Sequence, residues 1–346
     1  MIDPTGSSPA LAWLSCEDGS IILGTGPFQE SSEAPKDRGA FYVSRFSNKS
    51  KNPWKIPKIT EIVDFSYLKN RLNETFDQNN KAIQWVPPEP ADFAAIFQEI
   101  DEAIRNGRVE KTVPVVTEYG VSEEIPALRI LRSMAGQTRP LISYAWCNGM
   151  GGFAGATPER LVTLRGNRLR TMALAGTART DDKLAFACDE KEIREHEYVA
   201  QNLVTKLTPL GRVYRKQREV LELNGIVHFH SAIEVELSRD VSPLEAIDLL
   251  HPTPALGPLP RTEENLAELM DWRERLACPS EFGAPFGWLD PSGSFEAVVA
   301  IRGLWWDSNR LMLPAGCGII EASRLVNEWR ELRLKREAVK RYIADS

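Results

Sequence analysis

Apolar residues recur at helical spacing in three long segments of the chain. In residues 90–106 the repeating positions are Phe93, Ile96, Phe97, Ile100 and Ile104. Gly107 follows directly and can end a helix. The same spacing, with charged residues between the apolar ones, marks residues 189–207 and 326–344. Because residues three or four apart share one helix face, the pattern predicts three helices, each buried on one side.

Shorter apolar runs between turn-forming residues predict strands. They are residues 112–116, 141–147, 161–164, 170–174, 233–237, 297–301 and 311–314. The first 90 residues carry turn formers and prolines, and we interpret them as an N-terminal scaffold of the same domain. Strands mixed with long helices, without regular alternation, are typical of an α+β fold. We therefore expect one large α+β domain.

The charge and cysteine content narrow the class of protein. The chain carries 42 Lys and Arg against 48 Asp and Glu, and it has no block of basic residues. Nucleic acids and anionic membranes attract clustered positive charge, so we expect neither as a partner. The chain also shows no secretory signal and no apolar run near the roughly 20 residues of a membrane span. Five scattered cysteines without CxxC spacing indicate reduced thiols. These features favour a cytoplasmic protein that acts on a small molecule.

Two pairs of glutamates are candidates for a metal site. Glu192 and Glu195 are three residues apart in one predicted helix, and Glu328 and Glu331 are three apart in another. Each pair lies on one helix face. If the two faces met, the concentrated negative charge would need a cation, and oxygen ligands of this kind suit Mg²⁺. Spacing alone favours the alternative of solvated helix faces with ion pairs such as that of Lys191 with Glu195.

Other polar residues are ambiguous when each is taken alone. Arg302 directly follows an apolar strand. An arginine in this position either binds the carboxylate of a ligand or forms an ion pair inside the protein. His228 and His230 lie on one side of a predicted strand, which could mimic a metal pair, although structural hydrogen bonds are the commoner role. Lys111 alone would be interpreted as a surface lysine. Three loops of small residues could offer backbone amides to an anion. They are residues 173–177, 251–257 and 315–319.

In combination and order, these motifs resemble the family of chorismate-utilising enzymes. This family comprises isochorismate synthases, salicylate synthases, and the large subunits of anthranilate and aminodeoxychorismate synthases. The matching segments are residues 111–113, 156–160, 173–179, 190–196, 250–256, 282–283, 301–302, 316–320 and 328–331, together with His228 and Lys335. The resemblance implies two packed, mostly antiparallel sheets with helices outside and a site in the cleft between them. Residues 91–346 would form the catalytic region.

The resemblance also implies the acid and the base. A lysine at position 111 serves as the general base in the members that use water, whereas the members that use ammonia carry glutamine there. Glu159 would be the general acid toward a departing hydroxyl group. Lys111 must then be uncharged at the moment of attack, which requires a dry pocket, and the pKa of Glu159 must be raised so that it holds a proton.

The remaining roles follow from the same resemblance. Glu195 and Glu331 would bind Mg²⁺ directly, and Glu192 and Glu328 would hold it through water. The implied substrate-binding residues are Thr177, His228, Ala255, Leu256, Arg302, Gly316, Gly318 and Lys335. Among these, Arg302 and the amides of the two glycines would grip the enolpyruvyl carboxylate of chorismate, and Lys335 would lie near the ring carboxylate.

Two apolar positions favour isochorismate as the released product. Salicylate synthases typically have threonine at the position of Ala255 and tyrosine at the position of Phe282, and this chain has neither hydroxyl group. The alternatives are a salicylate synthase, an ammonia-using synthase that needs a glutaminase subunit, and a catalytically inactive chorismate-binding module. We expect a monomer with no glutaminase partner. The sequence leaves open whether the product feeds menaquinone, siderophore or salicylate synthesis.

Three residues depart from the family pattern. They are Pro114, Pro258 and Cys317. Pro114 cannot donate a hydrogen bond within a sheet, which points to a strand edge or a bulge. None of the three replaces a proposed acid, base or metal ligand, so we do not infer inactivity from them.

Overall fold

The strands of the molecule form two large antiparallel sheets. The computed structural model describes residues 10–73, 82–122, 125–149, 151–223, 225–307 and 310–344. Over these residues, one sheet has nine strands. In spatial order they are β6 (Ile59–Val63), β2 (Ile21–Thr25), β1 (Leu11–Ser15), β10 (Ile142–Cys147), β11 (Gly152–Thr157), β19 (Gly303–Trp306), β20 (Leu311–Gly316), β9 (Val115–Val121) and β7 (Gln84–Val86).

The second sheet has ten strands within the same described ranges. Nine of them run in the order β14 (Gly211–Arg215), β16 (Ile226–Leu237), β13 (Arg168–Arg179), β12 (Arg160–Arg165), β18 (Phe295–Val299), β17 (Pro285–Leu289), β4 (Ala40–Val43), β5 (Trp54–Ile56) and β3 (Gln29–Ser31). The tenth, β15 (Glu219–Leu223), pairs with β16. A short pair, β8 (Lys111–Thr112) with β21 (Ile319–Ile320), lies outside both sheets.

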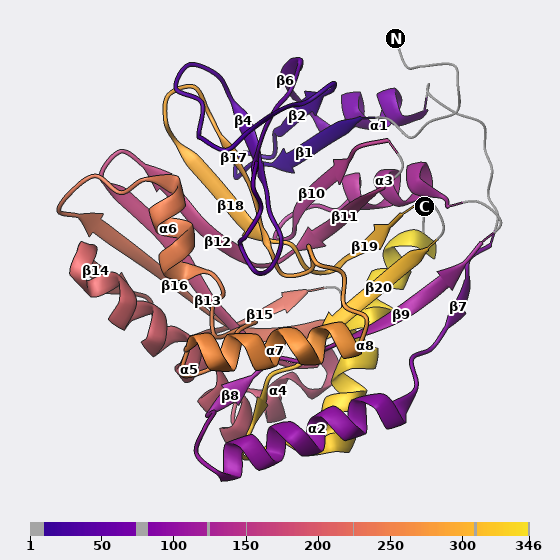
Figure 1. Cartoon of the computed structure of the whole chain (residues 1–346), viewed down its shortest axis with the longest axis vertical. Coiled ribbons are helices and arrows are strands. Elements are labelled where there is room, and N and C mark those ends of the chain that lie inside the picture. The colour runs from indigo at the N-terminus through magenta and orange to yellow at the C-terminus, as the bar shows by residue number, and fades with distance from the viewer. Residues whose placement is uncertain are drawn as a thin grey trace.

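Helices pack around the two sheets. They are α1 (Phe65–Asn73), α2 (Pro90–Arg105), α3 (Ala127–Ala135), α4 (Lys183–Phe186), α5 (Glu190–Leu207), α6 (Pro243–Leu250), α7 (Glu263–Arg275) and α8 (Leu325–Ala344). Helix α5 packs on β13 and β16, whereas α8 packs on β20 and against α3 (Figure 1). The expected α+β fold of antiparallel sheets with outer helices is confirmed.

Aromatic side chains join the two sheets across the main core. Phe286 of β17 lies 5.7 Å, ring centroid to ring centroid, from both Tyr144 of β10 and Phe153 of β11. Phe153 in turn stacks on Trp305 of β19. All four rings are buried. Burial of large rings in edge-to-face and offset contacts supplies much of the free energy that holds such a sandwich together. A second cluster packs α1 and α3 on the far side of the nine-stranded sheet.

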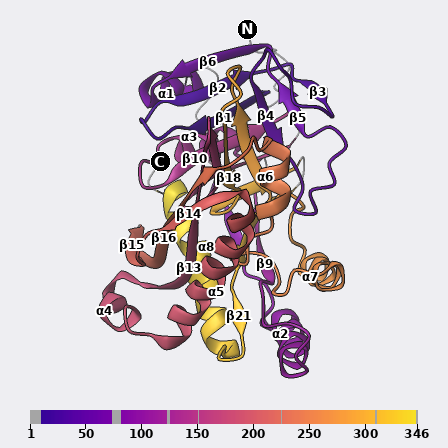
Figure 2. The same ribbon diagram turned by 90° about the vertical axis from the view of Figure 1, so that its left-hand side faces the viewer.

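The N-terminal segment contributes strands to both sheets. Strand β1 pairs with β10, and β4 pairs with β17, so the first 90 residues extend sheets whose other strands come from later in the chain. Figure 2 shows strands β1 to β6 gathered at one end of the molecule, away from α2 and α7. No helix in the described ranges is long and apolar enough to cross a membrane.

The predicted helices agree with the structure better than the predicted strands do. Helices α2, α5 and α8 begin and end within one residue of the predicted bounds. The single strand predicted for residues 112–116 is wrong. Strand β8 ends at Thr112 and β9 begins at Val115, because Pro114 has no N–H group to continue a ladder. Strands β13 and β16 are twelve residues long, far longer than predicted.

Candidate active site

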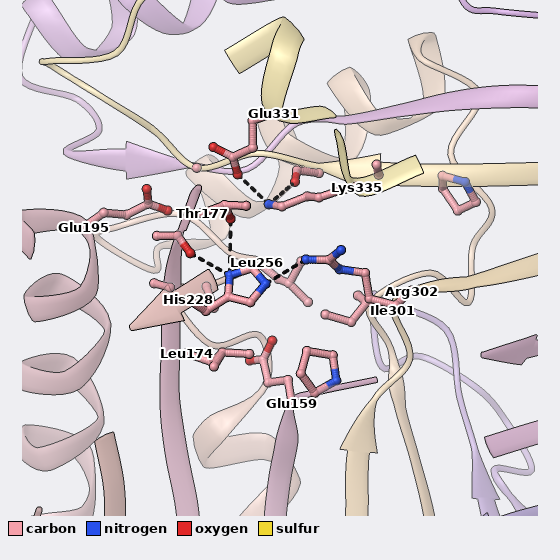
Figure 3. Close-up of a pocket in the computed structure, with 18 of the residues that line it drawn as sticks. Glu159, Leu174, Thr177, Glu195, His228, Leu256, Ile301, Arg302, Glu331 and Lys335 are labelled. Carbon is pink, nitrogen blue, oxygen red and sulfur yellow. Dashed lines mark hydrogen bonds and ion pairs between the residues drawn. The ribbon is translucent and has the colours of Figure 1, made fainter. Parts of the chain in front are cut away.

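A pocket that is partly open to solvent gathers most of the predicted site residues. Those that line it are Glu159, Thr177, Glu195, His228, Ala255, Leu256, Arg302, Gly316, Gly318, Glu331 and Lys335. They come from β13, β16, β20, α5 and α8, from the loop between α6 and α7, and from the connections after β11, β18 and β20. Figure 3 shows Glu159 at one end of the cavity, Glu331 and Lys335 at the other, and Arg302 with His228 between them. Lys111, Glu192 and Glu328 do not line the cavity.

Glu159 is a buried carboxyl group with an unusually high pKa. Its side chain is almost inaccessible to solvent, and burial raises its pKa to about 7 although Thr253, Lys111 and Lys335 act in the opposite direction. The hydroxyl group of Thr253 donates to its Oε1 at 3.3 Å. Burial disfavours the ionised form because a carboxylate loses its hydration. Glu159 can therefore hold a proton near neutral pH and donate it into the cavity.

Arg302 is positioned by a neutral histidine. Its Nη2 lies 2.9 Å from Nε2 of His228, and Nδ1 of His228 lies 2.6 Å from the carbonyl oxygen of Gly176. Since a carbonyl oxygen only accepts, Nδ1 carries the proton and Nε2 accepts from the guanidinium. Burial, followed by the nearby Arg302 charge, lowers the pKa of His228 well below its usual value. The partner of Arg302 is thus a neutral ring, and the guanidinium keeps its charge for a ligand.

The backbone at Arg302 is also unusual. Its φ is +57°, a left-handed conformation that costs energy for a residue with a side chain. The hydroxyl group of Tyr144 donates at 2.8 Å to the carbonyl oxygen of the preceding Ile301. Together these features turn the chain after β18 so that Arg302 enters the cavity.

The paired histidines do not form a metal site. His228 faces Gly176 and Arg302, whereas Nδ1 of His230 lies 2.8 Å from Oε1 of Glu219. Each ring has hydrogen-bond partners, in agreement with the structural role that the sequence favoured over a metal pair.

The four glutamates of α5 and α8 lie close together, and each forms an ion pair with a lysine. Nζ of Lys191 lies 2.9 Å from Glu192 Oε1, 3.2 Å from Glu195 Oε2 and 3.3 Å from Glu328 Oε1. The fourth carboxylate, Glu331, pairs with Lys335 at 2.5 Å. The alternative of solvated helix faces is wrong, because Glu195 and Glu328 are buried.

Burial and neighbouring charges shift the pKa values of three of these glutamates in different directions. Burial would raise the pKa of Glu195, but Lys191, Lys111 and Lys335 outweigh it and the pKa is lowered. Burial raises the pKa of Glu192 and Glu328, and the neighbouring carboxylates add to the rise despite Lys191. Glu195 is therefore the most firmly ionised of these three glutamates.

The donor set of the cluster fits a hard divalent cation. Across the described part of the chain, no three His, Cys, Asp or Glu side chains are arranged to hold a metal ion as they stand. Three carboxylates already surround one cationic nitrogen, however, and carboxylate oxygens are the ligands that Mg²⁺ prefers. In addition, Oε2 of Glu328 is buried and has no hydrogen-bond partner among the described residues.

Lys111 is buried rather than on the surface. Its side chain is fully inaccessible, and Nζ lies 2.5 Å from the carbonyl oxygen of Pro254 and 3.3 Å from Oε1 of Glu195. The interpretation as a surface lysine is therefore wrong. A Cβ atom added at Gly318 would lie 2.0 Å from Glu195 Oε1 and 2.9 Å from Lys111 Nζ. Gly318 thus provides the space in which the lysine and the carboxylate pair.

The sequence interpretation missed two residues of the site. Thr253 was not identified as the partner of Glu159, although it lies in the loop that the small residues had marked. Lys191 was identified only as an i,i+4 partner of Glu195, whereas it also contacts Glu328 of the other helix. The available signal was that Lys191 directly precedes Glu192 and lies one helical turn from Glu195.

Fold and pocket together define the class of protein. It is an enzyme scaffold in which a carboxyl group of raised pKa, a guanidinium oriented by a neutral histidine, and a cluster of carboxylates lie around one pocket. The model of the family described as chorismate binding enzyme matches residues 36–344. The chain therefore belongs to this family, and the resemblance predicted from its motifs is confirmed.

Individual relatives agree with this assignment. The chain is 31% identical over 249 residues to the salicylate biosynthesis isochorismate synthase of Pseudomonas aeruginosa PAO1, covering 69% of this chain and 52% of that protein. It is 31% identical over 193 residues to the isochorismate synthase MenF of Bacillus subtilis 168, covering 53% and 40%. The chain thus spans about half the length, or less, of these two relatives.

A solved structure supports the fold. The menaquinone-specific isochorismate synthase MenF of Escherichia coli matches with a TM-score of 0.81 at 18% identity, covering 98% of this chain and 90% of that chain.

Proposed function

We propose that the chain is a Mg²⁺-dependent isochorismate synthase, which adds water to C2 of chorismate and expels the hydroxyl group from C4. The observation that carries the proposal is the placement of Glu159, a carboxyl group with a pKa of about 7, at the end of the cavity opposite Glu331 and Lys335. A proton donor and a cation-binding cluster at the two ends suit a ring that must lose a hydroxyl group while its carboxylate is held.

Glu159 supplies the proton for the leaving group. As the C4–O bond breaks, its carboxyl proton passes to the departing oxygen, which leaves as water. The electron pairs of the ring shift toward C4 while the new bond forms at C2. The water that attacks C2 gives up one proton, so the net reaction is an isomerisation. General acid catalysis of this kind contributes about 10²- to 10⁴-fold in rate.

Lys111 accepts the proton of the attacking water. This role requires an amine without its proton, whereas the structure pairs Nζ of Lys111 with Glu195. Substrate and a cation bound to Glu195 would weaken that pair by drawing the carboxylate away. The carbonyl oxygen of Pro254 keeps the lysine anchored beside the cavity at the same time.

Arg302 and Lys335 hold the substrate carboxylates. Arg302, oriented by His228, takes the enolpyruvyl carboxylate with the amides of Gly316 and Gly318. Nζ of Lys335 donates to the carbonyl oxygen of Gly316 at 2.8 Å and pairs with Glu331. It therefore lies where the ring carboxylate meets the glutamate cluster.

Glu195 and Glu331 would bind Mg²⁺ directly, with Glu192 and Glu328 acting through water. When bound, the ion supplies positive charge that fixes the ring carboxylate and stabilises negative charge on the reacting ring. The buried Oε2 of Glu328, which has no hydrogen-bond partner in the described part of the chain, supports this assignment.

The apolar wall of the cavity favours release of isochorismate. Ala255, Leu256 and Phe282 line it, and none offers a hydroxyl group that would promote loss of pyruvate. We further propose that the enzyme works as a monomer. No glutaminase subunit is needed, because a lysine at position 111 favours water over ammonia as the nucleophile.

The test is to incubate the purified protein with chorismate and MgCl₂ and to separate the products by liquid chromatography with mass detection. Isochorismate without salicylate or pyruvate is the expected result. Salicylate with pyruvate would establish a salicylate synthase, and an aminated product with ammonium would establish the amine-transferring class. Tight chorismate binding without turnover would identify a catalytically inactive module.

A further inference from the structure

The ammonium group of Lys191 occupies the centre of the glutamate cluster. It contacts Glu192 and Glu195 on its own helix and Glu328 on α8, all within 3.3 Å. One lysine therefore links the two helices that carry the proposed metal ligands.

Electrostatics explain why a cation must be present there. Buried carboxylates held this close repel one another strongly unless a positive charge lies among them. Lys111 pairs with Glu195 and Lys335 with Glu331, but among these three lysines Lys191 is the one that contacts both Glu195 of α5 and Glu328 of α8. In the absence of a divalent ion, its ammonium group is therefore the positive charge between the facing carboxylates of the two helices. Glu328 is 1% exposed, and its second oxygen still lacks a partner among the described residues, so Lys191 satisfies the cluster only in part.

A divalent ion and this ammonium cannot hold the same oxygens. Mg²⁺ requires oxygens at about 2.0–2.1 Å in near-octahedral geometry. An ammonium group hydrogen-bonded to the same carboxylates would then face a doubly charged ion at very short range. Lys191 has room to leave, because its side chain is 18% exposed and lies in the first turn of α5.

From this geometry we propose that Lys191 is a built-in competitor for the divalent cation, which fills the carboxylate cluster when the metal is absent and withdraws when the metal binds. The inference rests on the metal site of the proposed function. If Lys191 competes in this way, displacing it costs part of the free energy of metal binding. The observed metal affinity is then weaker than the carboxylates alone would give. The cluster thereby stays folded at low metal concentration.

Replacing Lys191 with methionine, which keeps the unbranched side chain as far as Cε but removes the charged Nζ, tests the proposal. Lys340→Met is a matched control, because Lys340 has the same 18% side-chain exposure and pairs with Glu118 and Glu337, outside the cluster. We would measure Mn²⁺ binding by titration calorimetry and thermal unfolding in EDTA and in MgCl₂, all without chorismate.

The expected results differ for the two variants. Lys191→Met should unfold at a lower temperature than wild type in EDTA, gain more stability from MgCl₂, and bind Mn²⁺ at least about tenfold more tightly. Lys340→Met should lose equal stability with and without metal and keep the wild-type Mn²⁺ affinity. Unchanged or weaker Mn²⁺ binding by a folded Lys191→Met protein overturns the inference.

A second measurement does not depend on a variant that folds. A crystal structure of the wild-type protein grown with MnCl₂ should place Nζ of Lys191 beyond about 4 Å from the oxygens of Glu195 and Glu328, outside ion-pair range. A lysine that stays in contact with them overturns the inference. If the wild-type protein binds no Mn²⁺ at all, the metal site of the proposed function fails too, and calorimetry on wild type alone distinguishes the two failures.

Discussion

The imidazole of His228 holds the guanidinium of Arg302, with 2.9 Å between Nε2 and Nη2. Its own orientation is fixed by the carbonyl oxygen of Gly176, 2.6 Å from Nδ1. Because the arginine meets a neutral acceptor and not a carboxylate, its charge is directed but not neutralised. His228 is therefore a positioning residue for Arg302, which we propose binds a substrate carboxylate.

Replacement of His228 by phenylalanine should therefore weaken substrate binding more than it slows the chemistry. A hydrogen bond to a charged group contributes roughly 1.5–3 kcal/mol, so we expect KM for chorismate to rise about 10- to 100-fold. The kcat value should fall much less. Steady-state kinetics check this split, and His228→Asn, which can still accept a hydrogen bond, should recover part of the affinity. A loss confined to kcat would contradict the positioning role.

Lys111→Gln and Glu159→Gln should each abolish water addition while the protein stays folded. Removal of a proton-transfer group costs about 10²- to 10⁴-fold in rate. The measurement is isochorismate formation, with circular dichroism to verify folding and Lys340→Met as a control outside the site. Normal turnover by either variant would overturn the assigned roles.

The buried carboxyl group of Glu159 should make stability depend on pH. Its pKa is about 7 in the folded chain against an ordinary value of 4.5. Because the pKa of Glu159 is higher in the folded chain than in the unfolded chain, the group contributes fully to the free energy of unfolding below pH 4.5. This contribution is lost as the pH rises to about 7. The loss amounts to about 3 kcal/mol, because the buried group must then ionise.

Comparison of wild type with Glu159→Gln isolates this effect, since Glu192 and Glu328 titrate in both proteins. Relative to the variant, wild type should lose stability between pH 4.5 and pH 7 in urea denaturation experiments. A difference that stays constant with pH would show that Glu159 ionises normally. Activity of the wild-type enzyme should also decline above about pH 7, as the acid loses its proton.

Gly318→Ala should disrupt the site sterically. The added Cβ would overlap Oε1 of Glu195, only 2.0 Å away, and crowd Nζ of Lys111. We expect at least a 10²-fold loss of kcat/KM and weaker Mn²⁺ binding. Gly136→Ala is the matched control, because its nearest neighbouring atoms lie at 3.6 Å and the helix can accept alanine. Full activity of Gly318→Ala would show that the Glu195–Lys111 pair is dispensable.

Several features of the chain were predictable because they depend on local sequence. The bounds of α2, α5 and α8 follow from apolar spacing, whereas the single strand predicted for residues 112–116 is divided at Pro114. The ordered motifs also indicated the family, which the comparisons confirm. Strand lengths were less predictable, since the ends of β13 depend on its partner β16, more than 40 residues further along the chain.

The sequence by itself determined the three long helices α2, α5 and α8, the fold class and the residue types available for chemistry, because periodicity and motif order depend on the local order of residues. Only the tertiary structure decided how those residues are paired. It placed Thr253 against Glu159, 94 positions earlier, and His228 against Arg302, 74 positions later. It also buried Lys111 and brought Lys191 to Glu328 of a distant helix. Burial and long-range contacts set the charge and orientation of each group, and both arise only when distant segments pack together.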